Sequence, residues 1–142
     1  MVMKKVDIFN SYALLDVAKL TKLEDSDKFV VIKACKAMKP IYEELQSFKQ
    51  DTLKKLADEN HDKMVEVFEE WRKELKEPND EQKEAIKYVN KYTNNVNECL
   101  SEEFNKDVEA TWEKLSEDGL KKFVASNDWN VQQTISVMGL FE

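Results

Sequence analysis

Residues 23–60, LEDSDKFVVIKACKAMKPIYEELQSFKQDTLKKLADEN, carry the longest amphipathic pattern in the chain. Asp25 or Ser26 can cap a helix at its start, where acidic side chains also favour the positive end of the helix dipole. Apolar positions recur at steps of three or four residues, which predicts one helix of about nine turns. These positions are Phe29, Ile32, Cys35, Met38, Tyr42, Leu45, Phe48, Thr52 and Leu56.

Pro40 interrupts this pattern, because proline removes a backbone donor and clashes with the preceding turn. The helix can either bend at Pro40 or restart there with the proline in its first turn. The apolar positions continue beyond the proline at the same spacing, so we expect a kink within one long helix.

The segment before this helix has two parts. Residues 4–9, KKVDIF, alternate polar and apolar side chains, which predicts a short strand or an extended segment. Asn10 or Ser11 can then cap a helix of about three turns that carries Tyr12 and Leu15.

A helix hairpin follows the long helix. One apolar stripe runs from Met64 to Leu75, and Pro78 ends it. Asn79 or Asp80 caps a further helix, whose apolar stripe reaches Val96. The turn EPND at residues 77–80 is short, so we expect the two helices to lie antiparallel, with the hairpin at 78–80.

Residues 96–115 give a mixed pattern, because Phe104, Val108 and Trp112 step helically while Val108, Ala110 and Trp112 also alternate. Periodicity leaves both conformations open. In the extended alternative, residues 107–113 would pair with residues 4–9 as a two-stranded ribbon on a helical body.

The C-terminal segment predicts two short helices. Ser116 can cap one that runs through Phe123, and Asn130 with Gln133 resembles a capping box that opens the last helix. We expect that helix to dock through Trp129, Val131, Ile135 and Met138, while Leu140 and Phe141 either dock with it or stay exposed for a partner. The predicted partner-binding residues are Trp129, Ile135, Met138, Leu140 and Phe141.

Composition favours a mostly helical bundle. The chain has 142 residues with 2 Gly and 2 Pro, too few to punctuate a many-stranded sandwich or barrel. Its length suits a single domain over 1–142, with a C-terminal helical subdomain over 101–142 as an alternative. The predicted core consists of Phe29, Ile32, Leu45, Phe48, Phe68 and Trp71.

The net charge of −7 repels phosphate backbones, so nucleic acid is not an expected partner. The sequence has no apolar run of membrane-spanning length and no signal-peptide core, which predicts a cytoplasmic protein that does not enter a membrane. Cys35 and Cys99 are expected to be free, packed thiols.

No catalytic or cofactor-binding constellation is evident. His61 is the only histidine, and neither glycine belongs to a phosphate-binding loop. Asp58 and His61 are spaced like the acidic residue-x-x-His pairs of di-iron bundles, but such sites need two pairs. We therefore expect no enzyme activity, no cofactor and no metal.

Residues 6–57, VDIFNSYALLDVAKLTKLEDSDKFVVIKACKAMKPIYEELQSFKQDTLKKLA, resemble small uncharacterised proteins encoded near the tail genes of phages and prophages. The shared features are an extended start, a short Leu-rich helix, a Lys-Leu-acid turn and a long amphipathic helix. The close at 115–142, LSEDGLKKFVASNDWNVQQTISVMGLFE, fits their short helical ends. The resemblance implies a non-enzymatic role in assembly, for example as a chaperone of a longer structural protein.

Residues 107–138 are similar in spacing to ubiquitin-associated-type three-helix modules, especially SNDWNVQQTI at 126–135. Those modules carry a Met-Gly-Phe-like loop after the first helix, where this chain reads KLSEDG at 114–119. This departure argues against ligand binding in their mode.

These observations favour a protein-protein interaction or assembly protein whose partner is another protein. The alternatives are a regulator that uses the C-terminal segment as a helix-turn-helix, or a metal-binding helical protein. The long apolar stripe of residues 29–56 would also serve pairing between two copies, and the sequence leaves a homo-oligomer open.

Overall fold

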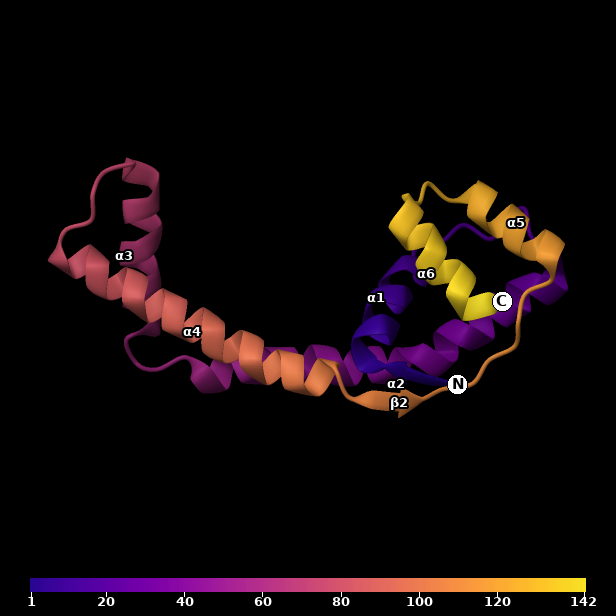
Figure 1. Cartoon of the computed structure of the whole chain (residues 1–142), viewed down its shortest axis with the longest axis horizontal. Coiled ribbons are helices and arrows are strands. Elements are labelled where there is room, and N and C mark those ends of the chain that lie inside the picture. The colour runs from indigo at the N-terminus through magenta and orange to yellow at the C-terminus, as the bar shows by residue number, and fades with distance from the viewer. The chain divides into compact units, whose positions relative to one another are not determined.

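The computed structural model describes all 142 residues, and it contains six helices and one two-stranded antiparallel sheet (Figure 1). The elements in chain order are β1 (Val2–Lys4), α1 (Lys5–Leu15), α2 (Asp25–Leu56), α3 (His61–Glu74), α4 (Asp80–Phe104), β2 (Asp107–Glu109), α5 (Glu117–Ser126) and α6 (Val131–Phe141). The prediction of a mostly helical protein with a minor β ribbon is confirmed.

The chain forms two compact units. The first comprises residues 1–46 together with 104–142, and the second comprises residues 47–103. This grouping differs from the expected C-terminal subdomain over 101–142. Pairing of β2 with β1, and packing of α6 on α1, hold the C-terminal residues against the N-terminal ones.

The β ribbon is confirmed, but its first strand lies earlier than expected. Val2, Met3 and Lys4 pair with Glu109, Val108 and Asp107 respectively. Residues 5–9, expected to be extended, begin α1 instead, so the predicted helix start at Asn10 or Ser11 is wrong. The physical reason is that Ile8, Ser11 and Leu15 fall on one side of a helix, and all three are buried.

Helix α2 continues through Pro40 without a restart, as the sequence predicts. Its burial differs from the prediction, because Phe29 and Ile32 are 61% and 45% exposed. Each step of three residues falls about 60° short of a full turn, so three such steps carry the predicted stripe from Phe29 round to the opposite side at Met38. The buried residues of α2 in the first unit are Asp27, Val30, Val31, Ala34, Met38 and Leu45.

The core of the first unit gathers side chains from α1, α2, α5 and α6. Ile8, Met38, Phe123 and Phe141 are completely buried. The rings of Phe123 and Phe141 meet edge to face with centroids 6.2 Å apart, a favourable arrangement for aromatic pairs. Figure 1 shows α6 lying between α1 and α5 in this unit.

In the second unit, a short loop that contains Pro78 joins α3 to α4. Figure 1 shows the two helices at a steep angle to each other, so they do not lie side by side as the antiparallel hairpin that the sequence predicted. Asn79 caps α4: the Gln82 N–H donates to Asn79 Oδ1 at 2.8 Å, and the Asn79 N–H donates to Gln82 Oε1 at 3.0 Å. Helix α3 ends at Glu74, and the next residue, Leu75, has φ 55° in the left-handed region. A non-glycine residue there is strained.

Helix α3 buries none of its residues completely. Phe68 and Trp71, predicted to be core, are half-buried, and so is Phe48 of α2, whereas Leu45 is buried as predicted. The reason is size, because a unit of few helices has too little material to enclose a large side chain on every side.

Tyrosines of α4 tie this unit together. The Tyr92 hydroxyl donates to the Leu53 carbonyl at 2.9 Å, and the Tyr88 hydroxyl donates to Asp58 Oδ1 at 3.2 Å. His61 Nδ1 lies 3.1 Å from the same Tyr88 oxygen, and its ring packs on Tyr92 with centroids 4.5 Å apart. The only histidine thus anchors the start of α3 to α4.

Candidate interaction surface

Helix α6 begins with the capping box that the sequence predicts. The Gln133 N–H donates to Asn130 Oδ1 at 2.8 Å, and the Asn130 N–H donates to Gln133 Oε1 at 3.0 Å. Reciprocal bonds of this kind satisfy two backbone donors that a helix start otherwise leaves free. They fix the residue at which the helix begins.

The buried side of α6 is not the predicted one. Val131 and Ile135 are 75% and 60% exposed, whereas Val137, Leu140 and Phe141 are at most 2% exposed. The helix therefore docks, as expected, but through a different side, and its last residues complete the core. Of the two alternatives for Leu140 and Phe141, the structure shows docking.

Two polar contacts hold the end of α6. The Trp112 indole Nε1–H donates to the Leu140 carbonyl at 2.7 Å, and the Leu115 N–H donates to the Phe141 carbonyl at 3.1 Å. Carbonyls of a last helical turn have no partner within the helix, so these contacts also cap it. The segment around 112–115 therefore positions the C-terminus.

The five predicted partner-binding residues do not share one surface. Trp129 is half-buried and packs edge to face on Phe123, with ring centroids 5.0 Å apart. Ile135 and Leu140 line a hollow between α6 and α1, while Met138 and Phe141 line a groove between α6 and α5. Their binding to a partner stays a prediction.

The groove between α5 and α6, here called the α5–α6 groove, has a volume of about 600 Å³. Its wall is mainly apolar, and Met138 is half-exposed within it. Its charged residues are Glu117 and Lys121, which form an ion pair at 3.4 Å, and Glu142. The apolar lining consists of Leu115, Leu120, Val124, Ala125, Met138 and Phe141.

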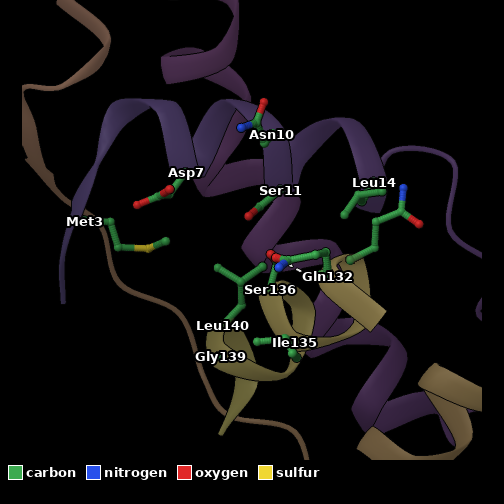
Figure 2. Close-up of a pocket in the computed structure, with 11 residues that line it drawn as sticks. Met3, Asp7, Asn10, Ser11, Leu14, Gln132, Ile135, Ser136, Gly139 and Leu140 are labelled. Atoms are coloured by element: carbon green, nitrogen blue, oxygen red, sulfur yellow. Dashed lines mark hydrogen bonds between the residues drawn. The ribbon is translucent and has the colours of Figure 1, made fainter. Parts of the chain in front are cut away.

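The second hollow, between α1 and α6, measures about 470 Å³ and is more polar (Figure 2). Asp7, Asn10 and Ser11 come from α1, and the α6 side carries Ile135 and Ser136. The Ser136 hydroxyl donates to the Gln132 carbonyl within its own helix, at 3.0 Å. This hollow offers dispersed polar groups and no cluster of like charge.

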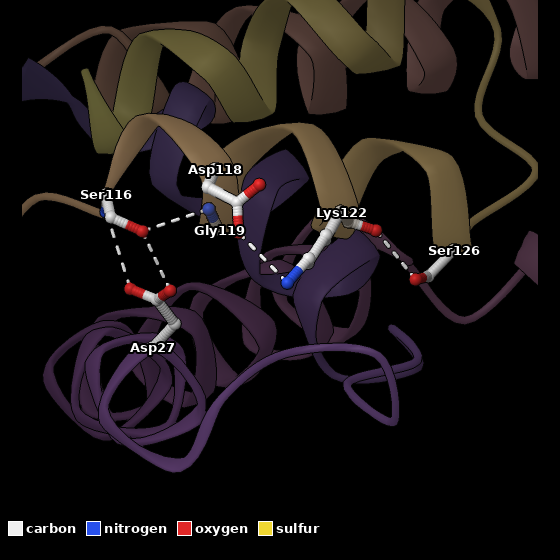
Figure 3. Close-up of polar contacts among 6 residues, drawn as sticks. All are labelled: Asp27, Ser116, Asp118, Gly119, Lys122 and Ser126. Atoms are coloured by element: carbon white, nitrogen blue, oxygen red, sulfur yellow. Dashed lines mark hydrogen bonds and ion pairs between the residues drawn. The ribbon is translucent and has the colours of Figure 1, made fainter.

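Asp27 of α2 holds the start of helix α5 in place (Figure 3). The Ser116 hydroxyl donates to Asp27 Oδ2 at 2.9 Å and accepts from the Gly119 N–H at 2.9 Å. A Cβ atom on Gly119 would collide with the Asp27 carboxylate, so glycine permits this close approach. The wall of the α5–α6 groove that α5 provides is therefore fixed to α2.

Within α5, Lys122 Nζ and Asp118 Oδ2 form an ion pair at 2.9 Å. Its hydrogen bond to the Asp118 carboxylate raises the pKa of Lys122. The Ser126 hydroxyl donates to the Lys122 carbonyl at 2.7 Å (Figure 3). These contacts lie within one helix and stabilise it locally.

The side chains that could act as nucleophiles or as metal ligands are dispersed over the structure. Burial, and secondarily the charge of Asp16, raises the pKa of the Cys35 thiol to about 11, which keeps it protonated at neutral pH. No three side chains among His, Cys, Asp and Glu come together in a geometry that would hold a metal ion.

None of the helices combines the length and the apolar character needed to cross a bilayer.

Sequence reasoning missed the α5 side of the groove. Leu120 and Val124 stand four residues apart and so share one side of a helix. This spacing was a usable signal, but the chain has many such pairs, and only packing shows which ones remain open.

The fold defines a mostly helical class of protein with a small antiparallel ribbon. No family model matches the chain, and no curated protein or solved structure is significantly similar to it. Its function must therefore be inferred from its own surfaces.

Proposed function

We propose that this protein is a non-enzymatic interaction protein that binds a short amphipathic helix of a partner protein in the α5–α6 groove. The observation that carries the proposal is the groove itself, which is about 600 Å³ in volume and lined by side chains of Leu120, Val124 and Met138. Grooves between two helices are a recurrent site for an amphipathic partner helix, which inserts apolar side chains spaced three or four residues apart.

Rigidity of the groove supports this occupant. Asp27 fixes α5 through Ser116, and the capping box at Asn130 fixes the start of α6. Binding to a preformed groove avoids the entropic cost of ordering its walls. Helix binding is therefore less costly here than on a mobile loop.

Charges at the rim of the groove suggest which charge the partner helix carries. Glu117 and Glu142 line the groove together with a single cation, Lys121, which is already paired with Glu117. A partner helix with basic residues beside its apolar stripe complements this rim. The resemblance of residues 6–57 to phage tail-gene proteins suggests assembly of a larger structure as the setting.

Site-specific photo-crosslinking tests the proposal. A photoreactive residue is placed at Val124, inside the groove, or at Lys87 on α4, and crosslinked species from the native host are identified by mass spectrometry. We expect one protein to crosslink at Val124 and not at Lys87, and Met138→Arg to abolish that crosslink. Equal crosslinking at both positions, or persistence of the product in Met138→Arg, would contradict the proposal.

A further inference from the structure

The first two turns of α2 leave two large apolar side chains in water. Phe29 is 61% exposed and Ile32 is 45% exposed, while their neighbours Val30 and Val31 are buried. Isolated exposed apolar residues are ordinary, but an adjacent pair on one side of a helix forms a patch. The two are spaced by three residues and therefore lie on the same side of α2.

A recess of about 280 Å³ opens beside Ile32. Residues of α1, of the loop that follows it, and of α2 line it together. Its apolar wall consists of Tyr12, Leu15, Ala18, Leu20, Val31 and Ile32. The patch therefore includes a concave site for an apolar side chain as well as a flat surface.

Lysines border this patch. Lys33 and Lys36 stand four and seven residues after Phe29, on the same side of the helix, and both are exposed. Neither forms an ion pair within the chain, whereas Lys39 pairs with Glu43 at 3.8 Å. Lys36 and Lys39 also line the recess. The patch therefore presents two unpaired cations, although the net charge of the chain is −7.

We propose that this lysine-bordered patch, defined by Phe29, Ile32, Lys33, Lys36 and Lys39, binds an acidic segment of a partner protein. An aromatic or aliphatic side chain of that segment occupies the recess beside Ile32. Asp or Glu residues flanking it pair with the two unpaired lysines. Charge complementarity selects this class of partner, and the recess supplies the anchor site.

A protein segment fits this surface better than an anionic membrane does. Asp16 lines the recess, and Asp25 and Glu43 stand on the same side of α2 as the lysines. A continuous anionic surface would meet these three carboxylates along with the lysines. A peptide can place its charges selectively, opposite Lys33 and Lys36.

The experiment selects binders from a displayed library of random 16-residue peptides on the full-length protein. Enriched peptides are measured against the wild type and against Lys33→Glu/Lys36→Glu. The matched control is Lys83→Glu/Lys87→Glu, two exposed lysines of α4 with the same change in charge. Far-UV circular dichroism checks that both variants keep their helical content.

We expect an enriched group with acidic residues around one aromatic or aliphatic position. Its affinity should fall by about tenfold or more in Lys33→Glu/Lys36→Glu, and should be unchanged in the α4 control. Ile32→Ser should weaken it as well, because the anchor loses an apolar neighbour. If the selection enriches no acidic peptides, or if the enriched peptides bind Lys33→Glu/Lys36→Glu as tightly as the wild type, the proposal is wrong.

Flotation with vesicles containing phosphatidylserine tests the competing class. If the wild type floats with the vesicles and Lys33→Glu/Lys36→Glu does not, the ligand of the patch is a membrane surface and the proposal of an acidic segment is wrong. If the wild type does not float, the result supports the acidic segment. The α5–α6 groove is tested separately, because Met138→Arg leaves the lysine-bordered patch intact. Failure of either proposal therefore does not decide the other.

Discussion

Asp27, in the first turn of α2, accepts a hydrogen bond from the Ser116 hydroxyl at 2.9 Å, although 89 positions separate the two residues in sequence. The same hydroxyl accepts the Gly119 N–H and so caps α5. Asp27 is 9% exposed, and hydrogen bonds to a charged, buried group are among the more stabilising ones. One carboxylate thus orients the cap of a helix distant in sequence.

Gly119→Ala should destabilise the protein by about 1 to 3 kcal/mol, because the added Cβ displaces Asp27 and breaks its bonds to Ser116. Gly139→Ala is the matched control, since a Cβ there meets nothing within 4 Å in helix α6. It should instead stabilise by up to about 1 kcal/mol through helix propensity. Urea denaturation measures both, and equal midpoints would contradict the role given to Gly119.

Phe123→Ala should cost about 3 to 5 kcal/mol, because this side chain is completely buried and contacts Phe141 and Trp129. Phe29→Ala removes the same atoms from a site that is 61% exposed, and should change the free energy of unfolding by less than about 0.5 kcal/mol. Chemical denaturation of the two variants gives the comparison. A large loss for Phe29→Ala would mean that the side chain is covered in solution.

Leu75→Gly should stabilise the protein by about 0.5 to 1 kcal/mol. Leu75 is 93% exposed and has φ 55°, a conformation that costs a residue with a Cβ but not glycine. Leu75→Ala is the control, because it removes the exposed side chain and keeps the strain. Leu75→Gly should therefore have the higher melting temperature in thermal unfolding. Equal melting temperatures would contradict the proposed strain at Leu75.

The two cysteines should react at different rates with iodoacetamide. Cys99 is exposed, whereas Cys35 is half-buried and its pKa is raised to about 11. Because a raised pKa favours the neutral thiol, Cys35 should stay unmodified near pH 8 and react only as the pH approaches 11 or when the protein unfolds. Peptide mapping by mass spectrometry follows each site, and rapid labelling of Cys35 at pH 8 would contradict its burial.

Deleting Leu140–Glu142 should cost several kcal/mol, because it removes two buried side chains and the carbonyls that accept from Trp112 and Leu115. Deleting Glu142 alone, which is exposed, should have little effect. A soluble, equally stable three-residue deletion would show that the end of α6 is not part of the core in solution.

Local features of the fold were predictable because they depend on neighbouring residues. Ser116, Asn79 and the Asn130–Gln133 pair cap the helices that the sequence predicts, and α2 runs through Pro40 as expected. Side-chain caps form within three residues of the chain, so a short window of sequence contains all the participating groups.

The candidate site was predicted only in part. The set Trp129, Ile135, Met138, Leu140 and Phe141 drew attention to α6, but the residues are divided between the core and two hollows on different sides of the helix. The groove depends on α5 as its second wall. No spacing within α6 shows where α5 lies.

By itself the sequence determined that α2 is a long amphipathic helix; the tertiary structure decided which side of it is buried. Residues 29–32, FVVI, place apolar side chains on nearly every side of a helix, so periodicity permits several buried faces. Packing selected Val30, Val31 and Ala34 and left Phe29 and Ile32 in water. The physical reason is that burial lowers free energy only where another element excludes water, and the elements that do so here come from both ends of the chain.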